Sequence, residues 1–144
     1  MRLEHSLVID RPVAEVFAFV ADPDNLPRWQ SGLLEVEKLS GDGGVGSRHR
    51  EVRSMLGRRI EQVLEVTALS PDQRLDLEVV EGPMHLTVEH TFEQAGAGTR
   101  ITVVGQGDAG TLFRFAGPVI ARAVKKQSQS DFARLRTVLE PGGA

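Results

Sequence analysis

Residues 59–92 read RIEQVLEVTALSPDQRLDLEVVEGPMHLTVEHTF and contain three segments in which apolar and polar side chains alternate. Alternation with a period of two indicates β-strands that bury one face. Turn-forming residues separate the segments, at Ser70-Pro71-Asp72-Gln73 and at Glu81-Gly82-Pro83. Because these turns are short, each strand is predicted to pair antiparallel with the next one.

The chain on either side of this stretch predicts four further strands and three helices. Two short helices are expected after the first strand, one starting at Asp10-Arg11-Pro12 and one running through Asn25–Trp29. A long helix, whose apolar stripe includes Val119, is expected from Thr111 to Pro141, with a kink or a separate lead-in turn at Gly117-Pro118. The seven predicted strands are Leu3–Ile9, Leu33–Lys38 (marked by Leu34 and Val36), Val45–Met55, Arg59–Leu69, Leu75–Val79, Leu86–Phe92 and Thr99–Val104.

This order of elements predicts an α+β protein in which residues 1–144 form a single domain. Consecutive antiparallel strands with one apolar face curl, because strands twist. Among the predicted elements only the C-terminal helix, at ~1.5 Å per residue, is long enough to cover the concave face. A nearly straight helix on a curved sheet leaves space between the two, and we expect a ligand-binding cavity there.

The composition narrows the possible functions. The chain has 17 basic and 20 acidic residues, a net charge of −3, one Trp, six Phe and no Tyr. Nucleic-acid binding is not expected, because such proteins show a basic excess and aromatic stacking platforms. The absence of cysteine excludes disulfides, thiolate nucleophiles and Cys-rich metal sites. No signal peptide or stable membrane insertion is predicted, so a cytoplasmic protein is expected.

A series of short motifs runs along nearly the whole chain: Ile9-Asp10-Arg11-Pro12 with Glu15-Val16-Phe17, Asp22-Pro23-Asp24-Asn25-Leu26 with Trp29, Val45-Gly46-Ser47-Arg48, Gly57, Glu65-Val66-Thr67 with Pro71, and Gly110-Thr111-Leu112-Phe113. In this order they resemble the polyketide cyclase/dehydrase and lipid-transport superfamily, which is START-like, Bet v 1-like and also called SRPBCC. The resemblance implies the helix-grip fold, in which a seven-stranded curved antiparallel sheet, two short N-terminal helices and one long C-terminal helix enclose a cavity. It does not choose a function, because the superfamily includes cyclases, lipid and hormone binders, and proteins with no known ligand.

The alternation also assigns side chains to the two faces of the predicted sheet. Glu51 and Arg53 share the inward parity, and they are expected to pair with each other or with a histidine, because an unpartnered buried charge is costly. The full inward polar set is His5, His49, Glu51, Arg53, Gln62 and His90, whereas His85 has the opposite parity. The apolar cavity wall is predicted to contain Leu64, Leu77, Val88, Phe92, Val124 and Phe132, with Trp29 as a lid or core residue.

Three functions fit these residues. The first is binding or transport of a small, largely apolar ligand with a polar end, such as a lipid, a polyketide or a quinone-like molecule. The second is a polyketide aromatase/cyclase or dehydratase, in which His49 or His90 moves a proton beside Glu51 and Arg53 holds a carbonyl or enolate oxygen. The third is a protein-interaction module. The same residues also fit a polar network that only supports the structure.

No cofactor is predicted. A metal site formed by His5, His49, Glu51 and His90 is not expected, because no HxxxH or HExxH spacing supports it. Residues 111–136 hold six basic residues against Asp131, including Arg122, Lys125 and Lys126, whereas residues 1–110 hold 11 basic and 18 acidic residues. We interpret the basic residues as a solvated helix face. Contact with an anionic surface or a partner protein, including a second copy in a homodimer, is the alternative.

Overall fold

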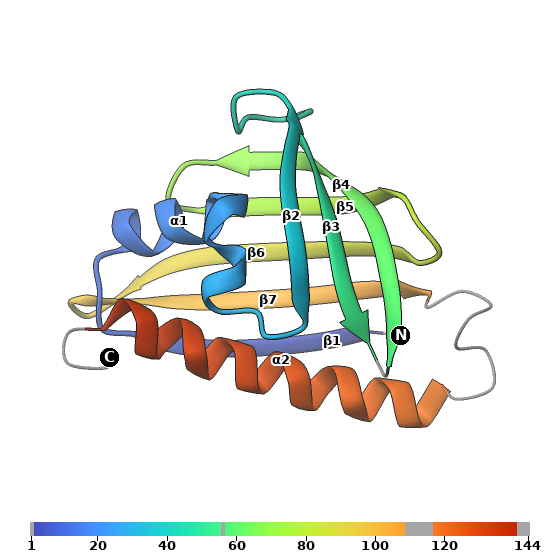
Figure 1. Ribbon diagram of the computed structural model, residues 1–144. Helices are drawn as coiled ribbons and strands as arrows, with labels where there is room; N and C mark the ends of the chain where they lie inside the picture. Colours follow the sequence, from blue (N-terminus) through green and yellow to red (C-terminus); the bar gives the residue numbers. More distant parts are fainter. Residues whose placement is uncertain (1, 56, 109–116, 141–144) are drawn as a thin grey trace.

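The computed structural model describes residues 2–55, 57–108 and 117–140. Within these residues it contains a seven-stranded sheet, two short helical segments after the first strand and one long helix after the last (Figure 1). The elements are β1 (Arg2–Ile9), α1 (Val13–Ala21), the 3₁₀ helix η1 (Pro23–Arg28), β2 (Leu33–Ser40), β3 (Arg48–Met55), β4 (Arg58–Ser70), β5 (Arg74–Glu81), β6 (His85–Ala95), β7 (Gly98–Asp108) and α2 (Gly117–Leu139).

The strands follow the spatial order β1-β7-β6-β5-β4-β3-β2, and every neighbouring pair is antiparallel. From β2 to β7 each strand therefore lies beside its neighbour in sequence, and β1 extends the sheet beyond β7. The sheet curls, so that β2 and β3 run across the direction of β6 and β7, while α2 lies along the open side (Figure 1). The predicted α+β class and the long helix over a curved antiparallel sheet are confirmed.

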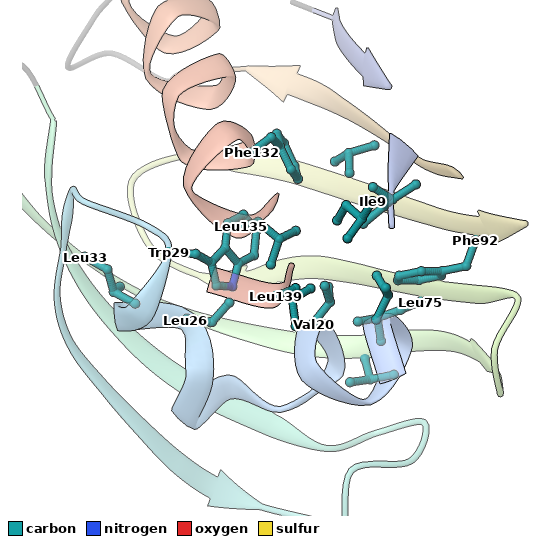
Figure 2. Close-up of a cluster of buried hydrophobic side chains, with 14 residues drawn as sticks. Ile9, Val20, Leu26, Trp29, Leu33, Leu75, Phe92, Phe132, Leu135 and Leu139 are labelled. Carbon is teal, nitrogen blue, oxygen red and sulfur yellow. The ribbon is translucent and has the colours of Figure 1, made fainter. Parts of the chain in front are cut away.

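The main hydrophobic core lies between the sheet and the second half of α2 (Figure 2). Phe132 and Leu135 of α2 are buried together with Ile9 of β1 and with Trp29, which follows η1. The ring centroids of Trp29 and Phe132 are 5.3 Å apart. This part of α2 is thus held against the sheet by buried side chains, and the burial of each large apolar side chain contributes roughly 1.5–3 kcal/mol.

Hydrogen bonds fasten the end of α2 to β1 and to the residues just after it. Arg136 Nε donates to the carbonyl oxygen of Val8 at 3.1 Å, and Arg11 Nε donates to that of Leu139 at 2.8 Å. The Leu139 carbonyl is one of those that a helix leaves without an intrahelical partner at its C-terminus. The C-terminal end of α2 is therefore anchored on the sheet.

Two strand predictions are wrong in detail. The third strand begins at Arg48 and not at Val45, because Gly46 has a φ of 93° and forms a turn that leaves Val45 66% exposed. In β2 the register against β3 shifts between Leu33 and Glu35, so that Leu33 is buried and Leu34 is 57% exposed. A shift of one residue moves side chains to the opposite face of a sheet.

The described part of the last helix begins at Gly117, so the predicted start at Thr111 lies outside the described residues. Pro118 occupies the first turn of this described helix, where a missing N–H breaks no intrahelical hydrogen bond. Val119 is 63% exposed, so it does not belong to the apolar stripe by which the helix packs on the sheet, and its prediction as part of that stripe is wrong. Within the described residues, no helix has the length and apolar character needed to cross a bilayer.

Candidate functional site

A cavity of about 360 Å³ lies between the curved sheet and the part of α2 from Ala123 to Phe132. Side chains of β1 and of β3 to β7 form its wall on the sheet side. The end of α1, Met84, and η1 with the residues that follow it contribute to the rest of the wall. All but one of the site residues predicted from the sequence line this cavity: His5, Trp29, His49, Glu51, Arg53, Gln62, Leu64, Leu77, Val88, His90, Val124 and Phe132.

Phe92 is the predicted site residue that does not line the cavity. It shares the inward face of β6 with His90 but lies further along the strand, where it is 4% exposed in the main core. Its ring meets that of Phe17 edge-on, with centroids 5.1 Å apart. At this end of the concave face α1 fills the space that the cavity occupies elsewhere, so Phe92 is a packing residue.

Three alternate positions of β3 form a hydrogen-bonded cluster at the cavity wall. Glu51 Oε2 accepts a hydrogen bond from His49 Nε2 at 2.8 Å, and Glu51 Oε1 accepts from Arg53 Nε at 3.2 Å and from Arg53 Nη2. The His49 and Glu51 side chains are each 4% exposed, and that of Arg53 is 21% exposed. Glu51 thus has the arginine and a histidine as partners, one on each oxygen.

The surroundings of Glu51 hold it in the charged state. Burial by itself raises the pKa of a carboxyl group, because it removes the charged form from water. Here the Arg53 guanidinium and the hydrogen bond from His49 outweigh burial and lower the pKa of Glu51 to about 2. Glu51 is therefore an ionised, fully paired carboxylate at neutral pH, which suits it to hold its neighbours in position and not to donate a proton.

Several polar atoms in the cavity wall retain hydrogen-bonding capacity. Arg53 Nη2 also donates to Gln30 Oε1 at 2.8 Å, but Nη1 donates to no residue in the described part of the chain. Gln62 lies opposite Glu51 in the β3–β4 register, with its Nε2 3.5 Å from Glu51 Oε1. Among the described residues, the buried Gln62 Oε1 and Trp29 Nε1 have no hydrogen-bond partner. Residues of the wall therefore carry unmatched donors and an unmatched acceptor.

His90 occupies a separate part of the wall, on β6. Its Nδ1 lies 2.9 Å from the carbonyl oxygen of Leu75. Because a carbonyl only accepts, Nδ1 carries the proton, and Nε2 of the neutral ring presents a lone pair. Burial lowers the pKa of His90, although the Leu75 hydrogen bond and the negative charge of Asp76 act in the opposite direction. His90 is therefore a neutral imidazole at neutral pH.

A polar contact between α2 and the residues before β2 is not predicted by the sequence. Asp131, 7% exposed, accepts hydrogen bonds at Oδ1 from the backbone N–H and the hydroxyl of Ser31, both at 3.1 Å, and from Gln127 Nε2 at 3.1 Å. Gln127 Nε2 also donates to the Ser31 hydroxyl. The only sequence signal is that Asp131 is the single acid among the basic residues of this helix.

His5 and three basic residues of α2 lie outside the two hydrogen-bonded clusters described above. The His5 ring stacks on Phe132 with centroids 5.1 Å apart, and burial together with the charge of Arg136 lowers its pKa. Within the described ranges, no three His, Asp or Glu side chains gather closely enough to hold a metal ion. Arg122, Lys125 and Lys126 are exposed and form no ion pair with any described residue, which leaves their role as a solvated face or an interaction surface a prediction.

A curved antiparallel sheet that grips a C-terminal helix over an internal cavity defines the helix-grip, or Bet v 1-like, class of proteins. Residues 1–140 match the model of the family described as polyketide cyclase / dehydrase and lipid transport, and the chain belongs to this family. The resemblance noted from the motifs is confirmed. A search of curated proteins finds no significant match.

Solved structures extend the comparison of folds. TTHA0849 from Thermus thermophilus is 16% identical with a TM-score of 0.84, over 94% of both chains. An aromatase/cyclase, Zhui, from a Streptomyces species is 17% identical with a TM-score of 0.80, over 94% of this chain and 91% of that one. Major latex-like protein 151 from Panax ginseng is 14% identical with a TM-score of 0.75, over 98% of both. At these identities the likeness shows the fold alone.

Proposed function

We propose that this protein binds a small, largely apolar ligand in its cavity and holds the polar end of the ligand against Arg53, Gln62 and Trp29. The supporting observation is that Gln62 and Trp29, which line a largely apolar cavity, each carry a buried polar atom with no hydrogen-bond partner among the described residues. Such atoms are rare in folded proteins, and each costs free energy. A ligand oxygen that accepts from Arg53 or Trp29, and a ligand hydroxyl that donates to Gln62, restore these bonds.

The polar end of the ligand is expected to be uncharged. Glu51 already neutralises Arg53 at hydrogen-bonding distance, so the cluster has no cation left for an anionic ligand. A ligand carboxylate next to Arg53 also meets the Glu51 carboxylate, and two like charges at close range disfavour each other. A carbonyl, a phenol or an alcohol avoids this repulsion, while the apolar body contacts Leu64, Leu77 and Val88.

The test compares two ligands that differ in one group, 2-naphthol and 2-methylnaphthalene, by fluorescence titration. We expect the wild-type protein to bind both compounds. In Gln62→Leu, affinity for 2-naphthol falls about fivefold or more, because a hydrogen bond is lost, while affinity for 2-methylnaphthalene stays or rises. His85→Ala is the control, because His85 is exposed on the face of β6 that points away from the cavity. This variant should leave the affinities for both compounds unchanged. The proposal is overturned if the wild-type protein binds neither compound.

A second candidate function is an aldol-type cyclisation, and the state of His90 favours it. The Nε2 lone pair of the neutral ring is suited to take a proton from a substrate carbon, which then attacks a carbonyl carbon. Arg53 Nη1 is suited to hold the oxygen that gains charge and finally a proton. The test is turnover of a reactive polyketone, with loss expected in both His90→Asn and Arg53→Ala. A wild-type rate equal to the rate in buffer contradicts this candidate.

A further inference from the structure

The inward face of β7 carries no side chain at two successive inward positions. Ile101 and Val103 point into the core and cavity, but the next two inward residues of the strand are Gly105 and Gly107. Gly105 lines the cavity, and its neighbours across the sheet are Leu3 of β1 and Val88 of β6. The cavity is therefore bounded by bare backbone between two apolar side chains.

The two glycines are there for different reasons. A Cβ atom at Gly107 would lie 1.9 Å from the carbonyl oxygen of His85, so the backbone itself requires glycine there. A Cβ atom at Gly105 would meet no atom of the described residues within 4 Å, and Gly105 is not among the residues with positive φ. Neither the backbone conformation nor packing against the described residues requires glycine at position 105. Glycine inside a strand weakens it and often marks a place where a ligand approaches the backbone.

Gly105 also lies far from the polar cluster along the sheet. In the strand order, β7 and β3 are separated by β6, β5 and β4, which is four inter-strand spacings. At ~4.8 Å per spacing, this is roughly 19 Å along the curved surface. A ligand whose polar end lies at Arg53 on β3 therefore extends its other end toward β7, where Gly105 leaves room.

We infer that Gly105 forms an apolar subsite for the tail of the ligand, and that its missing side chain sets the longest tail the cavity accepts. The inference rests on the proposed function, because it takes the ligand to be an apolar body with its polar end at the β3 cluster. To the proposed function it adds that residue 105 determines which lengths of ligand tail the cavity accepts. The ligand class is an uncharged oxygen compound with an unbranched apolar tail that lies flat against the backbone of β7.

The test uses Gly105→Ala, Gly105→Val and Gly105→Leu with a series of 2-alkanones of increasing chain length, measured by displacement of the uncharged fluorophore N-phenyl-1-naphthylamine. In the wild type, affinity rises with chain length up to a limit. In the Val and Leu variants this limit moves to shorter chains. The longest ketones lose roughly 15-fold in affinity, the equivalent of two buried methylene groups, and the shortest ketones lose nothing.

Val104→Leu is the matched control, since it enlarges the next residue of the same strand, which does not line the cavity. It leaves the length limit unchanged. The melting temperatures of the Gly105 variants equal or exceed that of the wild type, because the new side chain enters open apolar space.

The outcomes separate the two proposals. If the wild type binds the ketones and the Leu variant has the same length limit, the subsite does not exist and the proposed function stands. If the wild type binds neither the fluorophore nor any ketone, both are overturned. A large loss of stability already in Gly105→Ala contradicts the open space on which the inference depends.

Discussion

His49 and Glu51 lie two residues apart on the inward face of β3 and are joined by a 2.8 Å hydrogen bond from His49 Nε2 to Glu51 Oε2. Because alternate residues of a strand share a face, the strand itself brings them together. Arg53, two residues further on, completes the cluster on the other carboxylate oxygen. One short strand thus places a fixed charge pair and a histidine against an apolar cavity.

Removing Arg53 should destabilise the protein strongly. In Arg53→Met the Glu51 carboxylate stays buried without its cation, and we expect a loss of about 3 kcal/mol in the free energy of unfolding. The double variant Glu51→Gln/Arg53→Met should recover most of this loss, because no buried charge remains unpaired. Urea unfolding measures both. Arg48→Met, which breaks the more exposed pair with Glu65, is the control and should change stability much less. A double variant as unstable as the single one contradicts this account.

Replacing Gln62 should stabilise the protein while it weakens binding. Gln62 Oε1 is buried without a partner in the described structure, and its amide contact to Glu51 is long at 3.5 Å. Gln62→Leu removes the unmet acceptor and keeps a side chain of similar size, so the free energy of unfolding should rise by up to about 1 kcal/mol. Thermal unfolding without ligand provides the measurement. A clear loss of stability would show that Gln62 already has its hydrogen bonds in the free protein.

Stability should fall on acidification in two stages. The pKa of His90 in the folded state lies below its usual 6.5. The stability that the neutral His90 contributes is therefore complete above pH 6.5, and it decreases as the pH falls from 6.5 toward the lowered pKa. His5 acts in the same direction. The pKa of Glu51 falls from 4.5 to about 2 on folding, so its contribution is complete above pH 4.5 and about 3 kcal/mol is lost toward pH 2.

The first stage can be assigned with His90→Asn, measured by urea unfolding between pH 7 and 5. The asparagine amide keeps a donor for the Leu75 carbonyl but does not titrate. The free energy of unfolding of His90→Asn should therefore fall less with acidification than that of the wild type. The exposed His85→Asn should show the full wild-type slope. Equal slopes for His90→Asn and the wild type would mean that His90 titrates normally in the folded protein.

The Asp131 contact should secure α2 to the residues before β2. Asp131→Ala removes the acceptor of three hydrogen bonds and leaves the Ser31 N–H without a partner, so stability should fall by about 2 kcal/mol. Hydrogen exchange of the Ser31 amide should accelerate more than exchange in β6 or β7. Ser130→Ala, at the exposed neighbouring position, serves as the control. Unchanged exchange at Ser31 would contradict a holding role for Asp131.

Much of the site could be predicted because alternation is a local property. Within the β3–β4 pair the register runs without a shift from Arg48 to Met55, so the parity of Glu51 and Gln62 is correct. Leu34 was misplaced because a register shift interrupts β2, and no residue pattern marks it. Phe92 points to the predicted face of the sheet, but alternation does not tell whether an inward residue lies beside the cavity or beyond it. Phe92 lies beyond it, where α1 covers that end of the sheet.

The remaining site contacts join segments far apart in the chain. Gln30 meets Arg53 across 23 positions and Ser31 meets Asp131 across 100. Such pairs depend on how η1 and α2 close over the sheet, which is decided by packing and not by any local pattern. The unmet hydrogen bonds of Gln62 and Trp29 likewise become visible only once all their neighbours are in place.

The most direct test of the central claim uses the indole N–H of Trp29. Trp29 is the only tryptophan in the chain, so a ¹H–¹⁵N spectrum contains one indole signal that requires no assignment. On saturation with 2-naphthol, this proton should move downfield and exchange more slowly, because the ligand oxygen accepts its hydrogen bond. Saturation with 2-methylnaphthalene should produce neither change. Identical spectra with the two ligands would contradict the claim that buried polar atoms of the cavity hold the polar end of the ligand.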